Sequence, residues 1–349
     1  MDNLISYIKQ KLRGNQFYRL YCQQWINDIR YLFRNYRIKK LYYNCYDELT
    51  TEGHLLFFVQ DPEQRHPGFA DRLKVFCCLG YIAHVNGFLL KLVVDNNFPI
   101  AKYLEPVNED WRATWEDLCF NSKYSKLISY NGGRAKIPYL NKKINQYHVW
   151  NYIGLDMLCY KEKTNWQKTW KDAYDQLFQR TPYLDNILDS FDTFPPRSYI
   201  AVHLRFVNAL DHLEDGYSNE LSVIDQNKLI KKCLDGLSFI QKKYDTKLLV
   251  FSDSERFVNI CKDNGFETIE GGKIGHVSFD NTAFEKTVID FFMLGRAKEI
   301  VRFNCRELYE STFPIYASFV GECRFKEYNL DTSSFISDEA FLWHMINRE

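Results

Sequence analysis

The stretch Tyr199-Ile200-Ala201-Val202-His203-Leu204-Arg205 has the composition of a buried strand that ends in two basic side chains. After it, apolar strands and amphipathic helices alternate regularly. This alternation is typical of a doubly wound α/β domain, in which ligands bind beyond the carboxyl ends of parallel strands. The predicted strands are 199–204, 247–251, 268–269 and 299–303, and the predicted helices are 225–243, 254–264, 283–297 and 310–320.

A similar pattern comes earlier in the chain. Leu55-Leu56-Phe57-Phe58-Val59 predicts a buried strand, residues 70–86 predict a helix that stops at Gly87, and residues 88–94 predict a second strand. Strand, helix and strand in this order form the βαβ unit of a parallel sheet. The region 100–185 is less regular and predicts helices from about residue 164 and from 182.

Pro195-Pro196 interrupts the pattern between the two regions and is the predicted domain boundary. We expect a helical extension over 1–50, an N-terminal Rossmann-like acceptor domain over 51–195, a C-terminal Rossmann-like donor domain over 196–325, and a tail with a helix over 326–349. The length of 349 residues agrees with two domains, because single domains usually have about 100–200 residues. The predicted fold class is therefore α/β, with two Rossmann-like domains facing a central cleft.

Charge and composition argue against several classes of function. The 45 Lys and Arg residues equal the 45 Asp and Glu residues, so no basic excess indicates nucleic-acid binding. No apolar run is long enough for a transmembrane segment, and residues 1–14 lack the apolar core of a signal peptide. We therefore expect a cytoplasmic protein with reduced cysteines. A helical stripe near the N-terminus is expected to pack on its own domain, with peripheral membrane contact as the alternative; it consists of Leu4, Ile5, Ile8 and Leu12.

The basic side chains at the end of strand 199–204 are the first candidates for chemistry. Side chains alternate along a strand, so His203 and Arg205 are expected to point to the same side. A guanidinium at this position can bind a phosphate through two hydrogen bonds. The structural alternative is an arginine paired with a surface carboxylate and a histidine packed against the sheet.

Three motifs, in this order, resemble the GDP-fucose-dependent fucosyltransferase superfamily of α1,2-, α1,6-, protein O- and nodulation fucosyltransferases. His66-Pro67-Gly68-Phe69-Ala70-Asp71-Arg72 resembles its N-domain loop and helix, and Val202-His203-Leu204-Arg205-Phe206 resembles its His-x-Arg motif. Glu310-Ser311-Thr312-Phe313-Pro314 resembles the hydroxyl-bearing cluster that begins a late helix of the donor domain. The resemblance spans roughly residues 53–321. Where the family often continues the strand motif with Gly-Asp, this chain has Val207 and Asn208.

The resemblance implies the GT-B fold and an inverting, metal-independent transfer of fucose from GDP-fucose to a glycan, a lipid-linked glycan or a protein hydroxyl. Arg205 would be the catalytic cation, because preorganised donors stabilise the charge that develops on the leaving pyrophosphate. The departure at Val207 and Asn208 leaves open another nucleotide sugar, or a non-catalytic scaffold that binds a nucleotide or a glycan. The predicted donor-binding residues are His203, Arg205, Asn208, Asp253, Ser311, Thr312, Phe313, Gly68 and Arg72.

Asp71 is the first candidate for the base that accepts the proton of the acceptor hydroxyl. Its alternative role is a charge that complements the dipole of the helix it begins. Ser311 and Thr312 at the start of the late helix either contact phosphate or simply cap that helix. For Arg72 the alternative to an anion contact is a surface ion pair.

Asp253 follows the strand 247–251 and is a candidate nucleotide contact, although Ser252-Asp253-Ser254-Glu255 also has the pattern of a capping box. Asp253-x-Glu255 further resembles a metal-binding acidic pair, which we discount because a helix start explains it. The loop 271–276, which includes His276, and the helical Asp290 are candidate nucleotide contacts by position only, and the alternative for Asp290 is a residue on the polar face of its helix.

Overall fold

The computed structural model describes residues 33–34, 36–43, 46–62, 67–94, 97–128, 140–150, 166–211, 220–269 and 281–336. The predictions for the N-terminal stripe, for the loop 271–276 and for the helix near the C-terminus lie outside these residues. Contacts divide the chain into two compact units. The first comprises Met1–Asp61, Ile82–Val94 and Trp111–Asn151, and the second comprises Pro62–Tyr81, Asp95–Asp110 and Tyr152–Glu349.

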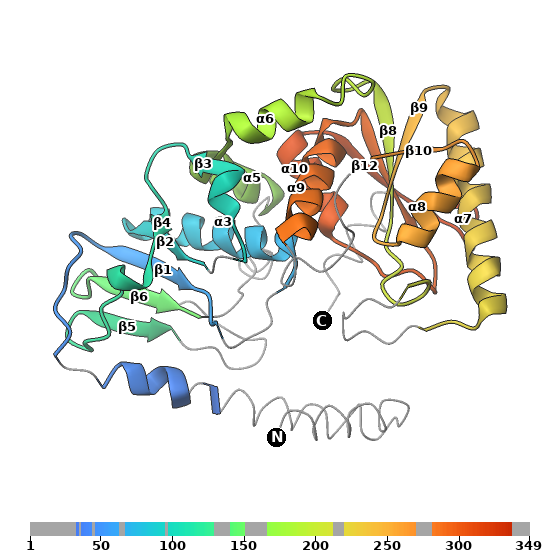
Figure 1. Cartoon of the computed structure of the whole chain (residues 1–349). Helices are drawn as coiled ribbons and strands as arrows, with labels where there is room; N and C mark the ends of the chain where they lie inside the picture. The colour runs from blue at the N-terminus through green and yellow to red at the C-terminus, as the bar shows by residue number, and fades with distance from the viewer. Residues whose placement is uncertain are drawn as a thin grey trace. The chain divides into compact units, whose positions relative to one another are not determined.

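The first unit contains a parallel sheet with the strand order β4-β2-β1-β6-β5 (Figure 1). The predicted βαβ pattern is confirmed: α3 connects β1 to β2 and ends before Gly87, whose φ of +67° favours glycine. Every residue of β1 is buried. The bounds are β1 Leu55–Val59, α3 Phe69–Asn86, β2 Leu89–Val93, β4 Arg112–Ala113, η3 Trp115–Asp117, β5 Ser125–Ile128 and β6 Gln146–Val149.

The second unit contains a sheet with the order β10-β9-β8-β11-β12-β13 (Figure 1). Its first five strands in the chain are parallel, and β13 pairs antiparallel with β12. Counted from β8, this is the order 3-2-1-4-5-6 of dinucleotide-binding domains, which reverses between β8 and β11. The bounds are β8 Tyr199–Leu204, β9 Lys247–Ser252, β10 Glu267–Thr268, β11 Glu299–Asn304, β12 Arg324–Asn329 and β13 Ser334–Phe335.

Helices cover both faces of this second sheet, α7 and α8 on one face and α9 and α10 on the other (Figure 1). Ile200, Val202 and Leu204 of β8 belong to one buried cluster with the apolar side chains of α7 and α8. Because side chains alternate along a strand, His203 lies on the opposite face. The helix bounds are α7 Val223–Tyr244, α8 Glu255–Asp263, α9 Asn281–Arg296 and α10 Phe313–Gly321.

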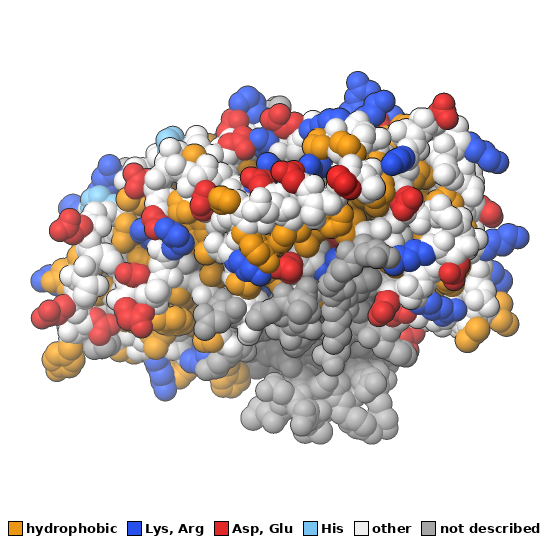
Figure 2. Space-filling model, turned by 45° about the horizontal axis from the view of Figure 1, so that its top comes forward, with side chains coloured by type: hydrophobic (Ala, Val, Ile, Leu, Met, Phe, Trp, Pro, Cys, Tyr) orange, Lys and Arg blue, Asp and Glu red, His pale blue; other side chains and the backbone are white. Residues whose placement is uncertain are grey.

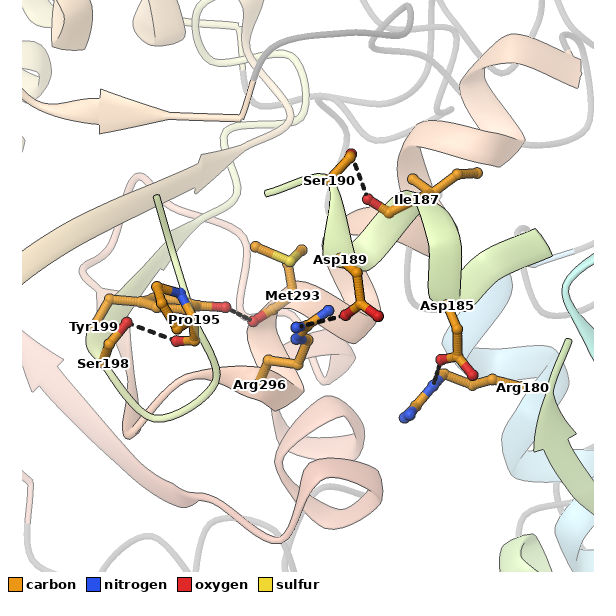
Figure 3. A network of polar contacts seen from close by, with 10 residues as sticks. All are labelled: Arg180, Asp185, Ile187, Asp189, Ser190, Pro195, Ser198, Tyr199, Met293 and Arg296. Carbon is orange, nitrogen blue, oxygen red and sulfur yellow. Dashed lines mark hydrogen bonds and ion pairs between the residues drawn. The ribbon is translucent and has the colours of Figure 1, made fainter. Parts of the chain in front are cut away.

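The segment that leads into β8 is attached to α9 of the same unit (Figure 3). Asp189 at the end of α6 forms an ion pair with Arg296 at 3.0 Å, and the Tyr199 hydroxyl donates to the Met293 carbonyl oxygen. These contacts group α6 with the second sheet, whereas the predicted boundary at 195–196 assigns it to the N-terminal domain; the predicted domain limits stay a prediction. The remaining bounds are η2 Ile100–Lys102, β3 Leu104–Pro106, α5 Trp166–Leu177, β7 Phe178–Arg180 and α6 Pro182–Asp189.

The distribution of surface charge and the state of the cysteines agree with what the composition predicts. Lys and Arg side chains are interspersed with Asp and Glu side chains on the face shown in Figure 2. Within the described residues, no helix has both the length and the apolar character needed to cross a bilayer. The cysteines in the described ranges are free thiols, and burial raises the pKa of the Cys77 and Cys233 thiols.

Candidate functional site

The segments that leave β8 and β11 meet where the strand order of the second sheet reverses. The Tyr309 N–H donates to the Arg205 carbonyl oxygen at 2.8 Å. The Arg205 guanidinium carbon lies 5.5 Å from the centre of the Tyr309 ring. Arg205 therefore follows β8 at the position where parallel sheets of this order bind nucleotides.

Asp253, at the carboxyl end of β9, holds the turn that follows β8. Its two carboxylate oxygens accept from the N–H groups of Phe206 and Val207, at 2.7 and 2.9 Å. Its nearer oxygen lies 3.8 Å from Arg205 Nε. Burial raises the pKa of the Asp253 carboxyl, whereas the Arg205 guanidinium and the backbone donors lower it.

The capping-box interpretation of residues 252–255 is wrong. Ser254 is the N-cap of α8, and its hydroxyl accepts from the Phe257 N–H at 3.0 Å. Asp253 points instead to the turn after β8, so its carboxylate organises the loop that carries the His-x-Arg motif. The sequence pattern missed this because the partner strand is about 50 residues away.

Val207 occupies a backbone conformation that is rare for a branched side chain. Its φ is 53°, in the left-handed region, and its side chain is buried. Such a conformation costs about 1–3 kcal/mol and persists only where surrounding contacts enforce it. The hydrogen bond from the Val207 N–H to Asp253 is such a contact. This contact explains how position 207 can be valine, although the fucosyltransferase superfamily often has glycine there.

His203 is buried against the start of α10. Its ring stacks on Phe313, with the ring centres 5.9 Å apart, and only 7% of its surface is exposed. Burial lowers the pKa of His203 to about 3, and the nearby cations of Arg205 and Arg302 act in the same direction. Its Nδ1 atom has no hydrogen-bond partner among the described residues. A buried polar atom of this kind is a candidate contact for a ligand.

The buried neutral state of His203 makes stability depend on pH. The folded-state pKa lies below the unfolded value of about 6.5. Between these values the unfolded chain binds more protons, so the free energy of unfolding falls as the pH falls. We expect His203→Gln to reduce this slope by about 1.4 kcal/mol per pH unit near pH 5, measured by urea unfolding between pH 7 and 4.

Exposed His84 supplies the matched substitution His84→Gln, which controls for the exchange of a histidine for glutamine at a site outside the core. Buried His148, whose pKa is also lowered to about 3 by burial, remains in both variants and keeps part of the slope. An unchanged slope in His203→Gln would show that His203 is not held neutral by the fold.

Arg302 on β11 is a site residue that the sequence analysis missed. It pairs in register with His203, and its guanidinium is buried. It donates to the Ser311 carbonyl oxygen at 2.7 Å and forms ion pairs with Glu310, at 3.0 Å, and with Glu327. Arg302 thereby fixes the segment that leads into α10. The available signal was a charged residue inside an otherwise apolar strand, which requires buried partners.

The two hydroxyls before α10 have different roles. The Ser311 hydroxyl accepts from the Phe313 N–H at 3.2 Å, so it satisfies one N–H group of the helix start. Thr312 is the N-cap residue, but its side chain makes no cap hydrogen bond. Its hydroxyl accepts instead from Lys74 Nζ, at 2.5 Å. Simple capping therefore does not account for Thr312.

The start of α3 contributes Asp71 and Lys74 to the same unit. Asp71 is half exposed and forms an ion pair with Lys74 at 2.6 Å. Arg72 is buried: its Nε donates to the Pro67 carbonyl oxygen at 2.9 Å, and its guanidinium carbon lies 4.1 Å from the centre of the Phe98 ring. Arg72 thus holds the loop ahead of α3 from within the core. A Cβ added at Gly68 would meet no atom within 4 Å, so internal packing does not require glycine there.

Most of the predicted residues lie in two connected groups. Arg205 and Asp253 lie together at the turn after β8, which also carries half-buried Asn208. His203, Phe313, Ser311, Thr312 and Asp71 surround the start of α10 through direct or shared contacts. Asp290 is paired instead with Lys286 on its own helix, and burial raises the pKa of the Asp290 carboxyl.

Two solved fucosyltransferase structures share the fold of this chain. Fucosyltransferase NodZ from Bradyrhizobium matches with a TM-score of 0.54 at 14% identity, over 82% of this chain and 99% of that one. NodZ α1,6-fucosyltransferase soaked with GDP-fucose matches with a TM-score of 0.51 at 13% identity, over 82% and 99%. This chain has the NodZ fold. The α/β fold class expected from the resemblance is thereby confirmed.

Overall sequence similarity is too low to detect this relationship, although the three motifs resemble the family. No protein-family model matches the chain, and no curated protein sequence matches it significantly. The identities of 13–14% to the NodZ structures explain why, because the fold is retained while few residues are. The roles of individual residues are therefore assigned from the geometry at the end of β8 and the start of α10.

Proposed function

We propose that the chain is an inverting, metal-independent glycosyltransferase that moves fucose from GDP-fucose to a hydroxyl of a glycan, a lipid-linked glycan or a protein. The observation that supports this most is the group of His203, Arg205 and the start of α10 at the strand-order reversal of the second sheet. GDP-fucose is the first donor to test, because a NodZ crystal of the same fold was soaked with it.

In the proposed reaction the acceptor oxygen attacks C1 of fucose while the bond from C1 to the β-phosphate oxygen breaks. The bonding electron pair leaves with GDP, and the hydroxyl proton passes to Asp71. One displacement of this kind inverts the configuration at C1. Arg205 and the positive end of the α10 dipole stabilise the charge that develops on the pyrophosphate, and this is the role a metal ion has in other transferases.

The proposal is tested by thermal unfolding of the purified chain with GDP, UDP and CMP, in the presence of EDTA. A ligand at about 100 times its Kd adds about 2.7 kcal/mol to the free energy of unfolding. We expect a shift with GDP and none of comparable size with CMP. Absence of a shift with all three nucleotides would contradict the donor site.

Two other outcomes assign a different function. A shift with UDP alone would indicate another nucleotide sugar, in line with Val207 and Asn208 at positions where the family often has Gly-Asp. A shift with GDP, but no release of GDP from GDP-fucose with any acceptor glycan or glycoprotein, would indicate a nucleotide-binding scaffold. Turnover that survives EDTA and inverts the anomeric configuration supports the proposed enzyme.

A further inference from the structure

Lys74 connects the predicted base to the predicted phosphate site. Its Nζ lies 2.6 Å from Asp71 Oδ1 and 2.5 Å from Thr312 Oγ1, although Thr312 is more than 200 residues away in sequence. It also lies 4.8 Å from the centre of the Tyr316 ring in the first turn of α10. The Lys74 side chain is only 16% exposed, against 52% for Asp71. All four residues belong to the second unit.

The position of this ammonium is unusual for a purely structural lysine. The N-terminus of a helix carries a partial positive charge, so acidic groups are favoured there and cations are disfavoured. Lys74 nevertheless places its charge on the N-cap residue of α10. The partner that offsets it, Asp71, is the half-exposed member of the pair. This arrangement suits an anion that is present only part of the time.

A second observation independently indicates a ligand at the same helix start. His203 stacks on Phe313, the first residue of α10, and its buried Nδ1 has no partner among the described residues. Burial keeps the imidazole neutral, so it leaves one nitrogen free to bond a polar group of the ligand. The two features together describe a site for a group with strong acceptor oxygens, such as a pyrophosphate.

We propose that Lys74 couples donor binding to catalysis: when the pyrophosphate binds at the start of α10, the Lys74 ammonium transfers from Asp71 to a phosphate oxygen. This inference rests on the proposed function and adds a positioning role for Lys74. Before the donor binds, Asp71 Oδ1 is occupied by the lysine. Once Lys74 bonds the phosphate, Asp71 is open to the acceptor hydroxyl and its proton. Donor binding thus frees Asp71 Oδ1 for the acceptor hydroxyl.

The first test compares GDP and GMP binding by calorimetry, because a loss at Lys74 should depend on the number of phosphates. Loss of a charge-assisted hydrogen bond is worth about 1.5–3 kcal/mol, which converts to a loss of roughly 10- to 100-fold in affinity. We expect Lys74→Met to lower the affinity for GDP by this factor and the affinity for GMP by less. Lys74→Arg should recover part of the lost GDP affinity. Lys168, in an exposed pair with Asp172, supplies the control Lys168→Met. Equal losses for GDP and GMP would overturn the assignment.

The second test separates the coupling from simple repulsion between Asp71 and phosphate. If Asp71 holds Lys74 away from the donor, Asp71→Asn should raise the affinity for GDP several-fold while it lowers kcat. In a Lys74→Met background the same substitution should no longer raise the GDP affinity. A double-mutant cycle measures this difference between the two backgrounds. Equal tightening in both backgrounds would overturn the coupling. Failure of the proposed function gives different results: the wild-type chain would then bind no GDP, or would bind GDP without releasing it from GDP-fucose to any acceptor.

Discussion

Replacement of Arg205 by alanine is expected to lower the rate of fucosyl transfer by roughly 10²- to 10³-fold. The residue combines a fixed charge with a position beyond β8, where the strand order reverses. Its side chain is partly exposed, at 31%, and its guanidinium lies close to the Asp253 carboxylate and to the Tyr309 ring. A group held in this way stabilises developing charge without rearrangement during the reaction. The measurement is kcat/KM for GDP-fucose with a fixed acceptor.

Two further variants make this result specific. Arg205→Lys keeps the charge but loses the planar pair of donors, so we expect an intermediate loss. Arg180→Ala removes an exposed arginine that is paired with Asp185, and it should leave the rate unchanged. Full activity in Arg205→Ala would contradict the central role of this residue. An equal loss in Arg205→Ala and Arg180→Ala would indicate that both variants act through folding.

The predictable part of the fold is the part in which local sequence and burial agree. Residues 55–59 form β1 with the predicted limits, because five consecutive apolar residues match a strand buried on both faces. The helices 225–243 and 283–297 are confirmed within about two residues as α7 and α9. The predicted start of the last helix, at 310, is wrong by three residues. Pro314 and the contacts of Arg302 with Glu310 and Ser311 delay the helix until Phe313.

Several strands were not predicted from the sequence, and β6 and β12 show why. β6, Gln146–Val149, is fully buried although it contains Gln146 and His148. Its polar groups are satisfied by distant residues: His148 bonds to the Tyr42 hydroxyl at 2.7 Å, and Gln146 bonds to Thr51. β12, Arg324–Asn329, has a largely polar sequence, and its buried Glu327 is paired with buried Arg302. In both cases tertiary partners replace the apolar side chains that sequence patterns detect.

The local motifs of the candidate site could be predicted from the sequence, but the contacts between its segments could not. The motif around Arg205 and the cluster before α10 were recognisable, since each is local in sequence. Lys74, Arg302 and Tyr309 were not, because their roles depend on contacts with other segments. Asp253 shows the same limit: its local pattern favoured a helix cap, and its actual partners belong to the turn after β8.

The close crossing of α9 and α10 fixes the position of this site, and it leaves no room for a side chain at Gly321. A Cβ at Gly321 would overlap the carbonyl oxygen and the Cα of Gly295. Both are backbone atoms, so no side chain can move aside. Arg197 binds the same crossing, donating to the carbonyl oxygens of Ala297, at 2.6 Å, and of Gly295 and Gly321. A methyl group would therefore separate two helices that one guanidinium joins.

We expect Gly321→Ala to lower the free energy of unfolding by about 3 kcal/mol, the upper part of the range for overpacked sites. For a chain of 349 residues, with an unfolding entropy of about 2.1 cal/mol/K per residue, this converts to a fall of roughly 4 °C in Tm, measured by calorimetry or circular dichroism. Gly68→Ala is the matched control, because its added Cβ meets no atom within 4 Å, and its Tm should hold or rise slightly. Thr312 and Phe313 lie at the start of α10, so Gly321→Ala should also lower the affinity for GDP at temperatures where the variant is still folded. An unchanged Tm would mean that the two helices can separate without loss, and the crossing would then not fix the donor site.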